Sequence, residues 1–130
     1  MSVSLLVITH NQLGQELIDT AASILNRHLL NVNFISSSAN LEPNDLEHYA
    51  DQVDDMINQL DIEKGALILT DICGGTPHNL AKYFATDKNI NIVSGISLPM
   101  LLRVLNYPNQ SLQALSQTAI EGACKGALQD

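Results

Sequence analysis

The chain has 130 residues, of which 45% are hydrophobic, 15% charged and 4% aromatic, and its net charge is −8. This charge argues against nucleic acid as a partner, because phosphates require a basic surface, and no apolar run approaches the roughly 18 residues that a membrane span requires. The composition is typical of a globular protein, and the length predicts a single domain over residues 1–130.

Cysteine usage bears on the cellular compartment. The sequence holds two cysteines, Cys73 and Cys124, and no charged stretch followed by a long apolar stretch precedes the first predicted strand. Few cysteines and the lack of a recognisable signal peptide are typical of proteins of the reducing cytoplasm. We therefore expect a cytoplasmic protein without membrane insertion.

The first predicted element is a strand from Val3 to His10. Its apolar residues form a nearly continuous run without charge, which is typical of a strand in a parallel sheet with both faces covered. In open α/β sheets, ligands bind beyond the carboxyl ends of the strands, where backbone N–H groups of the next helix point outward. His10 is predicted to lie at that edge, either as a residue that takes part in the chemistry or as a hydrated loop histidine.

The next two elements are a helix and a shorter strand. Apolar residues recur at helical spacing from about Gln12 to His28, and Asn11 is the candidate N-cap of this helix. Asn31 to Ser36 alternate in part between apolar and polar residues, which predicts a strand nearer the edge of the sheet.

A second helix is predicted to open at Pro43 and Asn44, with Asn44 as its N-cap and Glu47 as the capping partner. Its buried stripe is predicted to consist of Leu46, Ala50, Val53, Ile57 and Leu60. Eight of the 14 Asp and Glu residues lie between positions 42 and 63, so the opposite face is acidic. That face is either a solvated helix surface or a docking surface for a basic protein.

Gly65 to Thr70 form the second uncharged apolar run and predict a central strand, which ends at Asp71. Thr76 and Pro77 are typical of the N-cap and the first residue of a helix. The residues of this helix predicted to pack inward are Leu80, Ala81 and Phe84.

The last part of the chain predicts one strand and two helices. The strand covers Ile90 to Ser94, a helix begins at Pro99 and stops near Tyr107, and Ser111 caps the final helix. The resulting order predicts an α/β fold with a three-layer, doubly wound, mainly parallel open sheet of four strands and helices on both faces. A short fifth, antiparallel strand is an alternative.

Three predicted strand ends carry polar or glycine-rich sequence, at Thr9-His10, Asp71 to Pro77 and Gly95 to Pro99. Because these strands are neighbours in a doubly wound sheet, we expect the three loops to share one edge. Gly74-Gly75 before a helix start lets the backbone approach an anion, whose charge the positive end of the helix favours. The segment is neither a P-loop nor a dinucleotide fingerprint; it predicts a phosphate-sized site or, alternatively, a plain tight turn.

His10 and Asp71 are the candidate chemical groups of this site. An imidazole needs one unprotonated nitrogen to attack phosphorus, and a carboxylate that accepts the N–H of the other nitrogen fixes the tautomer. Asp71 is placed to be this carboxylate, although it could also be a turn residue. Phosphoryl transfer depends mainly on alignment and fixed donors, so we expect neither a dedicated metal nor a cofactor.

Three stretches, VITHN, LTDICGGTPHN and SGISLPMLL, resemble the IIA component of the mannose-type sugar phosphotransferase system, and the resemblance extends over nearly the whole chain. It implies that His10 is the phosphorylated histidine and Asp71 its carboxylate partner. The residues assigned to phosphate binding are Thr9, Gly74, Gly75 and Thr76.

The resemblance also implies the partners. It predicts a cytoplasmic phosphocarrier and homodimer that accepts a phosphoryl group on His10 from phospho-HPr and passes it to a separate EIIB protein, with only peripheral contact to the membrane through the permease complex. The alternatives are a regulatory module whose partners depend on the phosphorylation of His10, a IIA-like subunit that feeds a dihydroxyacetone kinase, and a receiver-like domain phosphorylated on Asp71. A receiver would need an acidic pair after the first strand, where this chain has Thr9-His10.

Several residues depart from the usual pattern of that family. Asn11 replaces a glycine, so the turn relies on an asparagine tolerating positive φ, while Cys73, His78 and Ser97 replace tryptophan, phenylalanine and asparagine. We expect His78 to be a plain surface histidine, Cys73 an inert thiol and Arg103 a surface arginine rather than a phosphate ligand.

The final helix has one nearly flat side, because Gly122 and Gly126 stand four residues apart. This side predicts either close packing within the fold or, together with the resemblance, a face of the expected homodimer.

Overall fold

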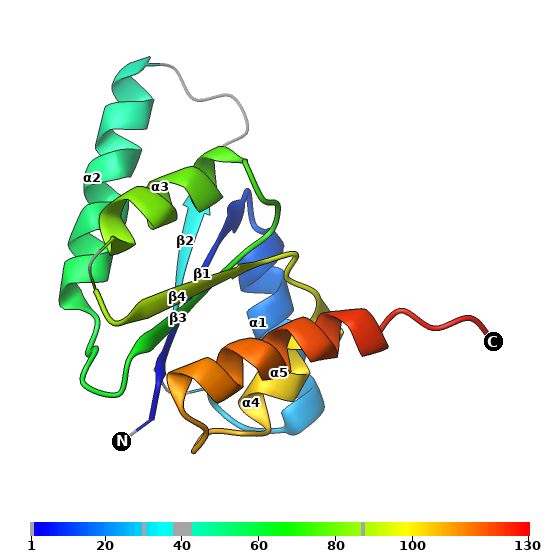
Figure 1. Ribbon diagram of the computed structural model, residues 1–130. Helices are drawn as coiled ribbons and strands as arrows, with labels where there is room; N and C mark the ends of the chain where they lie inside the picture. The colour runs from blue at the N-terminus through cyan, green and yellow to red at the C-terminus, as the bar shows by residue number, and fades with distance from the viewer. Residues whose placement is uncertain (1, 30, 38–42, 87) are drawn as a thin grey trace.

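The computed structural model describes residues 2–29, 31–37, 43–86 and 88–130. Strands and helices alternate in the predicted order, with two helices at the end of the chain (Figure 1). The elements are β1 (Ser4–His10), α1 (Leu13–Leu25), β2 (Val32–Ser37), α2 (Pro43–Gln59), β3 (Ala66–Thr70), α3 (Thr76–Ala85), β4 (Ile90–Ser94), α4 (Leu98–Leu105) and α5 (Leu112–Lys125).

The strands form one parallel sheet in the order β2-β1-β3-β4, so β1 and β3 lie at its centre. Leu5 of β1 is paired with Val32 of β2 on one side and with Leu67 of β3 on the other. Every residue of β3 and all but the end residues of β1 are buried. The two uncharged apolar runs are therefore the central strands, as predicted, because helices cover both faces of the sheet.

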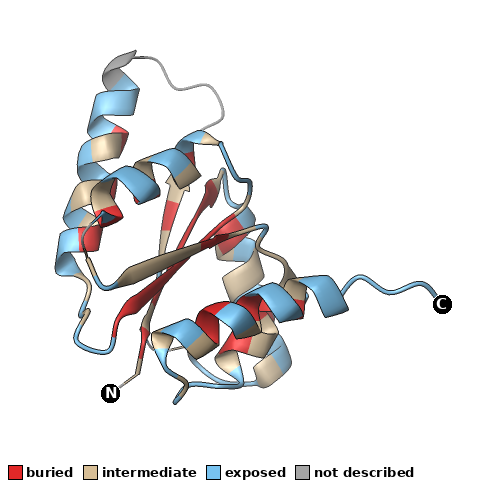
Figure 2. Ribbon diagram, viewed as in Figure 1, coloured by how far each residue is buried: buried red, intermediate tan, exposed pale blue. Residues whose placement is uncertain are grey.

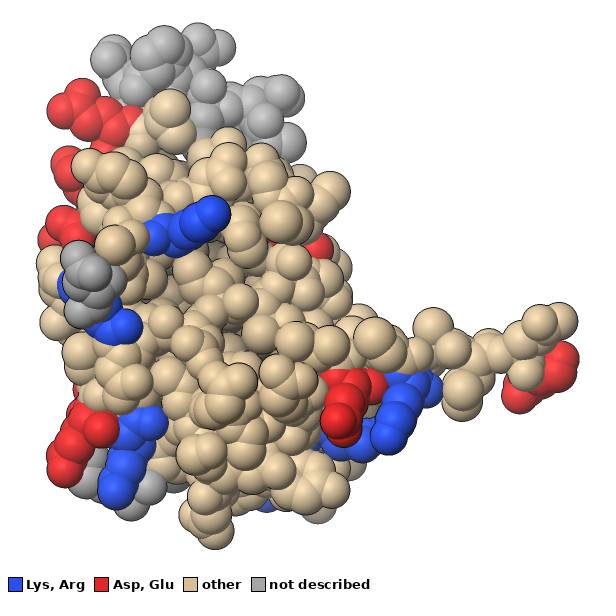
Figure 3. Space-filling model, viewed as in Figure 1, with Lys and Arg blue, Asp and Glu red and all other residues tan. Residues whose placement is uncertain are grey.

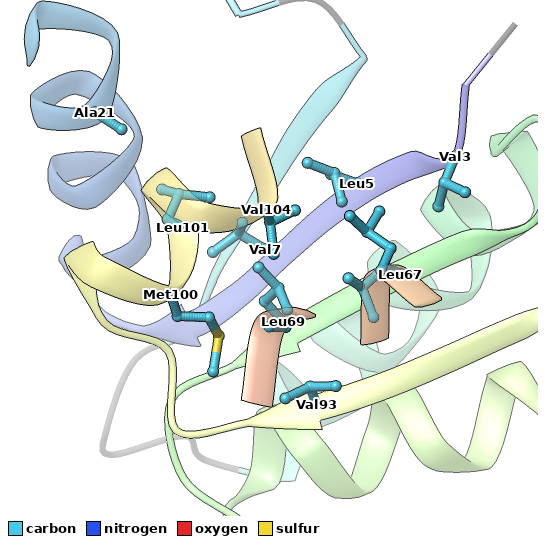
Figure 4. Packing of buried hydrophobic residues seen from close by; sticks show 12 residues of the cluster. Val3, Leu5, Val7, Ala21, Leu67, Leu69, Val93, Met100, Leu101 and Val104 are labelled. Atoms are coloured by element: carbon cyan, nitrogen blue, oxygen red, sulfur yellow. The ribbon is translucent and has the colours of Figure 1, made fainter. Parts of the chain in front are cut away.

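Alternate residues of each strand belong to two separate hydrophobic cores. Leu5 and Val7 pack beneath α1, α4 and α5 (Figure 4), whereas Leu6 and Ile8 pack beneath α2 and α3. Figure 2 shows buried residues along the central strands and on the inward sides of the helices. The predicted three-layer, doubly wound fold is confirmed, and the described residues contain no fifth strand.

The start of α1 differs from the prediction. Its N-cap is Gln12, which makes no side-chain cap hydrogen bond, and Asn11 lies before it with a φ of 50°. Asn11 is therefore not the N-cap, but it does tolerate positive φ in the turn, as expected. The capping hydrogen bond comes from further upstream, since the backbone N–H of Gly14 donates to Thr9 Oγ1 at 2.8 Å.

The predictions for α2 were partly wrong. The helix begins at Pro43, so Asn44 lies inside it and cannot be its N-cap. Leu46 is 41% exposed, and the buried stripe begins instead at Tyr49 and continues through Val53 and Ile57. The buried stripe thus starts three residues later than predicted, at an aromatic residue of the core on this face of the sheet. The carboxylates of α2 lie on its solvent side, along one edge of the molecule in Figure 3.

The three remaining helices begin close to their predicted starts. Gly75 is the N-cap of α3, so Thr76 and Pro77 are its first two residues, one position later in the helix than predicted. The N-cap of α4 is Ser97, whose side chain accepts a hydrogen bond from Met100 N, and α4 ends at Leu105 rather than near Tyr107. Ser111 caps α5 as predicted.

The flat side of α5 packs against α4. A Cβ built on Gly122 would lie 2.9 Å from Arg103 Cβ, and one built on Gly126 would lie 2.4 Å from Pro99 Cβ. The glycines are needed for this close approach, so their side faces the interior of the fold and does not offer a dimer surface. Among the described helices, none is long and apolar enough to cross a membrane.

Candidate functional site

The predicted site loops meet at the carboxyl edge of the sheet. His10 is the last residue of β1, next to Ser37 at the end of β2. The loops after β3 and β4 are joined by backbone hydrogen bonds, from Gly95 N to Asp71 O at 3.2 Å and from Ile96 N to Thr70 O at 3.0 Å. The expectation that the three loops share one edge is confirmed.

His10 and Asp71 are in direct contact. Asp71 Oδ2 lies 2.8 Å from His10 Nδ1 and also accepts the backbone N–H of His10 at 2.8 Å. The other carboxylate oxygen, Oδ1, accepts the N–H of Ile72 at 2.9 Å. Three hydrogen bonds thus fix the carboxylate, whose side chain is 11% exposed, while the imidazole remains 31% exposed.

The surroundings of Asp71 favour its charged form. Burial raises the pKa of the carboxyl, but the hydrogen bonds from the backbone and ring of His10, the charge of that ring and the N–H of Ile72 outweigh it, so the pKa of Asp71 lies below its ordinary value. Asp71 is therefore an anion near neutral pH and accepts the proton of His10 Nδ1. In that tautomer His10 Nε2 carries a free lone pair.

The loop from residue 72 to 77 lies against the His10 ring. Gly74 adopts a φ of +88°, which favours glycine. A Cβ built on Gly75 would lie 3.1 Å from His10 Cε1 and 2.9 Å from Ile72 Cγ2, so a side chain at this position would press on the imidazole. Gly75 then caps α3, and the side chain of Thr76 is exposed. The start of α3 thus lies beside His10, and the N–H of its N-cap Gly75 donates to Ile72 O at 3.3 Å. The positive end of a helix favours an anion at such a position.

Thr9 occupies a supporting position. Its side chain is fully buried, and its hydroxyl donates to His10 O at 3.2 Å while accepting from Gly14 N. A buried hydroxyl in this position links the end of β1 to the start of α1. Thr9 thus holds the backbone at His10 from a fully buried position.

Sequence reasoning missed a second histidine contact. His78 was expected to be a plain surface residue, but it is half-buried, and its Nδ1 lies 2.9 Å from Oγ1 of the buried Thr70. Its Nε2 lies 4.0 Å from Cys73 Sγ. The sequence held one indication of this contact, because Thr70 ends an apolar run predicted to be a buried strand and a buried hydroxyl needs a hydrogen-bond partner.

Two residues of the covering helices, Arg103 in α4 and Tyr49 in α2, are also partly or fully buried. Arg103 is half-buried, with its side-chain stem packed against Gly122. Tyr49 of α2 is buried, and burial raises the pKa of its phenol to about 12, with the hydroxyl of Ser37 lowering it and the charge of Asp71 raising it. Nothing in the sequence singled out Tyr49. Across the described residues, no group of three or more His, Cys, Asp and Glu side chains is placed to hold a metal ion.

Apolar side chains also reach the surface near the site. Ile72, directly after Asp71, is 58% exposed, and Leu13, at the start of α1, is 47% exposed. Both belong to loops or helix starts at the carboxyl edge of the sheet, where His10 lies. The site therefore has a partly apolar rim beside the 31% exposed side chain of His10.

The sequence of this chain matches a known protein family. A family model named EIIA-man and described as "PTS system fructose IIA component" matches residues 4–120. The PTS system mannose-specific EIIAB component of Escherichia coli (strain K12) is 28% identical over 129 residues, which cover 97% of this chain and 39% of that protein. This chain thus spans about two fifths of the length of that relative.

A second relative and a solved structure agree with this match. The PTS system fructose-specific EIIA component of Bacillus subtilis (strain 168) is 37% identical over 68 residues, 45% of this chain and 47% of that protein. The structure of a mannose/sorbose specific IIA subunit of the phosphotransferase system from Enterococcus faecalis superimposes with a TM-score of 0.86 at 18% identity, covering 100% of this chain and 96% of that one. That likeness shows a common fold.

Proposed function

This chain belongs to the EIIA-man family of phosphotransferase system (PTS) components, and on that premise we propose that His10 carries a phosphoryl group from one protein to another. The observation that supports this most directly is the 2.8 Å contact between Asp71 Oδ2 and His10 Nδ1. It leaves Nε2 as the nucleophilic nitrogen on the exposed side of the ring. Asp71 would act as the catalytic partner that holds the ring.

The proposed transfer is a displacement at phosphorus. The lone pair of His10 Nε2 attacks the phosphorus of a donor phosphohistidine, the donor's P–N bond breaks, and its electron pair returns to the donor ring. Positive charge develops on the His10 ring as the new P–N bond forms. The anionic Asp71 stabilises that charge through Nδ1–H, and the reverse process delivers the phosphoryl group to an acceptor.

The loop before α3 is the proposed phosphate site. Gly74, Gly75 and Thr76 lie at the positive end of α3, where the phosphoryl oxygens would be favoured. The N–H of Gly75 already donates to Ile72 O at 3.3 Å, so the proposed donors are the N–H groups of Gly74 and Thr76. The missing side chain of Gly75 leaves room beside His10 Cε1. Thr76 can add its exposed hydroxyl, whereas Thr9 would act indirectly, because its hydroxyl links the end of β1 to the start of α1.

The proposed donor is phospho-HPr and the proposed acceptor is a separate EIIB protein. The name of the Escherichia coli relative joins an A and a B component in one protein, which supports a B component as the acceptor. We further propose that residues 1–130 act as a single cytoplasmic domain and homodimer, which reaches the membrane only through the permease complex. The half-exposed Ile72 and Leu13 would contact the partner proteins, because apolar side chains at an open rim favour docking.

The test is phosphorylation by enzyme I, HPr and phosphoenolpyruvate, followed by intact mass. We expect wild type to gain one phosphoryl group and His10→Ala to gain none, while His28→Ala, a change in an exposed histidine after α1, behaves as wild type. Onward transfer is then measured by adding candidate EIIB proteins. A phosphoryl group that is still gained by His10→Ala contradicts the proposal. So does a phosphoryl group that survives acid and is lost in base, because that behaviour indicates an acyl phosphate on Asp71.

A further inference from the structure

Beside the His10 site, His78 lies between a buried hydroxyl and an exposed thiol. Thr70 Oγ1, at the fully buried end of β3, lies 2.9 Å from His78 Nδ1, and Cys73 Sγ lies 4.0 Å from His78 Nε2. The three side chains come from a strand end, the loop after it and the first turn of α3. Together they form a hydroxyl–imidazole–thiol group, which we call the Thr70–His78–Cys73 group.

The order of these side chains is the one that activates a thiol nucleophile. A nucleophile beside a base that is itself oriented by a third group is the general arrangement of covalent catalysis. When His78 Nδ1–H donates to Thr70 Oγ1, the lone pair of Nε2 faces the thiol and can accept its proton. The resulting thiolate is the reactive form of cysteine, and the exposure of Cys73 makes it accessible.

We propose that Cys73 is a reactive thiol, assisted by His78, that exchanges with small-molecule disulfides and thereby blocks phosphoryl transfer at His10. The thiol proton moves to His78 Nε2, Cys73 Sγ bonds to one sulfur of the disulfide, and the original S–S bond breaks with the second sulfur leaving as a thiolate. A small thiol reverses the exchange by the same route and restores the free cysteine.

The position of Cys73 links this thiol to the phosphoryl site. Cys73 lies two residues after Asp71 and two before Gly75, whose backbone lies against the His10 ring. A group attached to Cys73 would stand on the loop that the phosphoryl donor must approach. This blocking role rests on the proposed function of His10, whereas the reactivity of the thiol does not.

The chain supplies a matched control in its second cysteine. Cys124 is also free and exposed, but it lies near the end of α5, and the hydrogen-bonded cysteine–histidine pair of the described residues is that of Cys73 and His78. The two thiols share the same protein, charge and solvent. A difference in their reactivity therefore reports on the local environment of Cys73.

The first experiment compares the two thiols without any phosphoryl donor. Cys124→Ser and Cys73→Ser proteins, each with one cysteine, are treated with cystamine, and the mixed disulfide is followed by intact mass. We expect Cys73 to react on the order of tenfold faster than Cys124, less than a well-aligned general base achieves, because the S–N distance is long. Adding His78→Phe to the Cys124→Ser protein should lower the Cys73 rate to that of Cys124, and His78→Asn serves as a second variant. Equal rates for the two cysteines, or rates indifferent to both changes at His78, overturn the proposal.

The second experiment measures phosphorylation of the Cys124→Ser protein by phospho-HPr before cystamine treatment, after it, and after reduction. The adduct should slow phosphorylation on the order of tenfold or more, as expected for a misplaced donor, and reduction should restore the rate, while Cys73→Ser should not respond. An adduct that leaves the rate unchanged overturns the blocking role. Failure of the untreated protein to accept phosphate contradicts the proposed function and with it the blocking role, but leaves the thiol rates to decide the reactivity of Cys73.

Discussion

Two adjacent residues at the end of β3 hold two different histidines. Asp71 Oδ2 lies 2.8 Å from Nδ1 of His10, and Thr70 Oγ1 lies 2.9 Å from Nδ1 of His78. The distances are nearly equal, but the carboxylate is charged and the hydroxyl is not. Only His10 therefore has a neighbour that stabilises the positive charge an imidazole develops when it bonds to phosphorus.

The surroundings of the two rings differ in the same direction. His10 ends a strand and faces a glycine loop with an open side. His78 lies in the first turn of α3, where its first ring nitrogen contacts a neutral hydroxyl and its second nitrogen faces Cys73. The comparison indicates that the neighbours of a histidine, more than its place at the sheet edge, decide which of the two can carry a phosphoryl group.

The largest expected effect on the rate of phosphorylation comes from removing the negative charge of Asp71 beside His10. Asp71→Asn keeps an oxygen that can accept the Nδ1 proton but loses the negative charge, so the rate of phosphorylation by phospho-HPr should fall on the order of a hundredfold. His78→Asn should leave that rate close to wild type. Stopped-flow or quenched transfer from labelled phospho-HPr measures both. Equal loss in the two variants would remove the distinction between the histidines.

The glycine loop provides the next comparison. Gly75→Ala would place a Cβ 3.1 Å from His10 Cε1, which displaces the ring or the loop and should slow phosphorylation about tenfold. Gly74→Ala meets no atom within 4 Å but must adopt a φ of +88°, so it should cost about 1 kcal/mol of stability with a smaller effect on rate. Urea unfolding and transfer kinetics separate the two. The reverse pattern would show that the loop acts through its conformation rather than through space beside His10.

A smaller effect is expected on the His78 side. Thr70→Val removes the hydroxyl that bonds His78 Nδ1 and should lower the free energy of unfolding by about 1 kcal/mol. Because Asp71 keeps its three hydrogen bonds, phosphorylation of His10 should remain close to wild type. Urea denaturation gives the first quantity and intact mass the second. Loss of phosphorylation in Thr70→Val would mean that the two histidines depend on each other.

The smallest effect concerns pH. The pKa of Asp71 is lower in the folded chain than in the unfolded one, so the stability it contributes is present above the unfolded value, near pH 4, and is lost as the pH falls through the folded value. Wild type should therefore exceed Asp71→Asn in stability at neutral pH, and the difference should shrink below about pH 4. The difference between wild type and Thr70→Val should not vary in this range. Urea unfolding at several pH values tests both statements.

The strands were predictable because burial on both faces leaves a clear mark on the sequence. The uncharged runs at β1 and β3 are typical of strands covered by helices on both faces, and their order placed His10 and Asp71 at one edge. The fold class followed from these local patterns, while the contact between these two residues was predicted from the patterns together with the family resemblance. The same patterns placed Ser111 correctly, because its hydroxyl caps the helix that directly follows it.

The errors arose where tertiary contacts replaced local ones. Asn11 was expected to cap α1, but the N–H of Gly14 in the first turn of the helix donates to the hydroxyl of Thr9 instead. The buried stripe of α2 begins at Tyr49 and leaves Leu46 41% exposed, because burial depends on which residues of the helix face the sheet and not on apolar character alone. The contact between Thr70 and His78 joins the end of β3 to the first turn of α3, and the two residues stand eight positions apart. No regular spacing in the sequence identifies a hydroxyl–histidine pair of this kind. The flat side of α5 was ambiguous for the same reason, since only the position of α4 shows what it contacts.

The most direct test of the account is NMR of the phosphorylated protein with isotope-labelled histidine ring nitrogens. We predict that phosphorus couples to Nε2 of His10, that Nδ1 of the same ring keeps its proton on the Asp71 side, and that the ring signals of His78 keep their tautomer. Phosphorus on Nδ1 of His10, on His78 or on Asp71 would contradict the claim that the carboxylate beside His10 selects the nitrogen that carries the phosphoryl group.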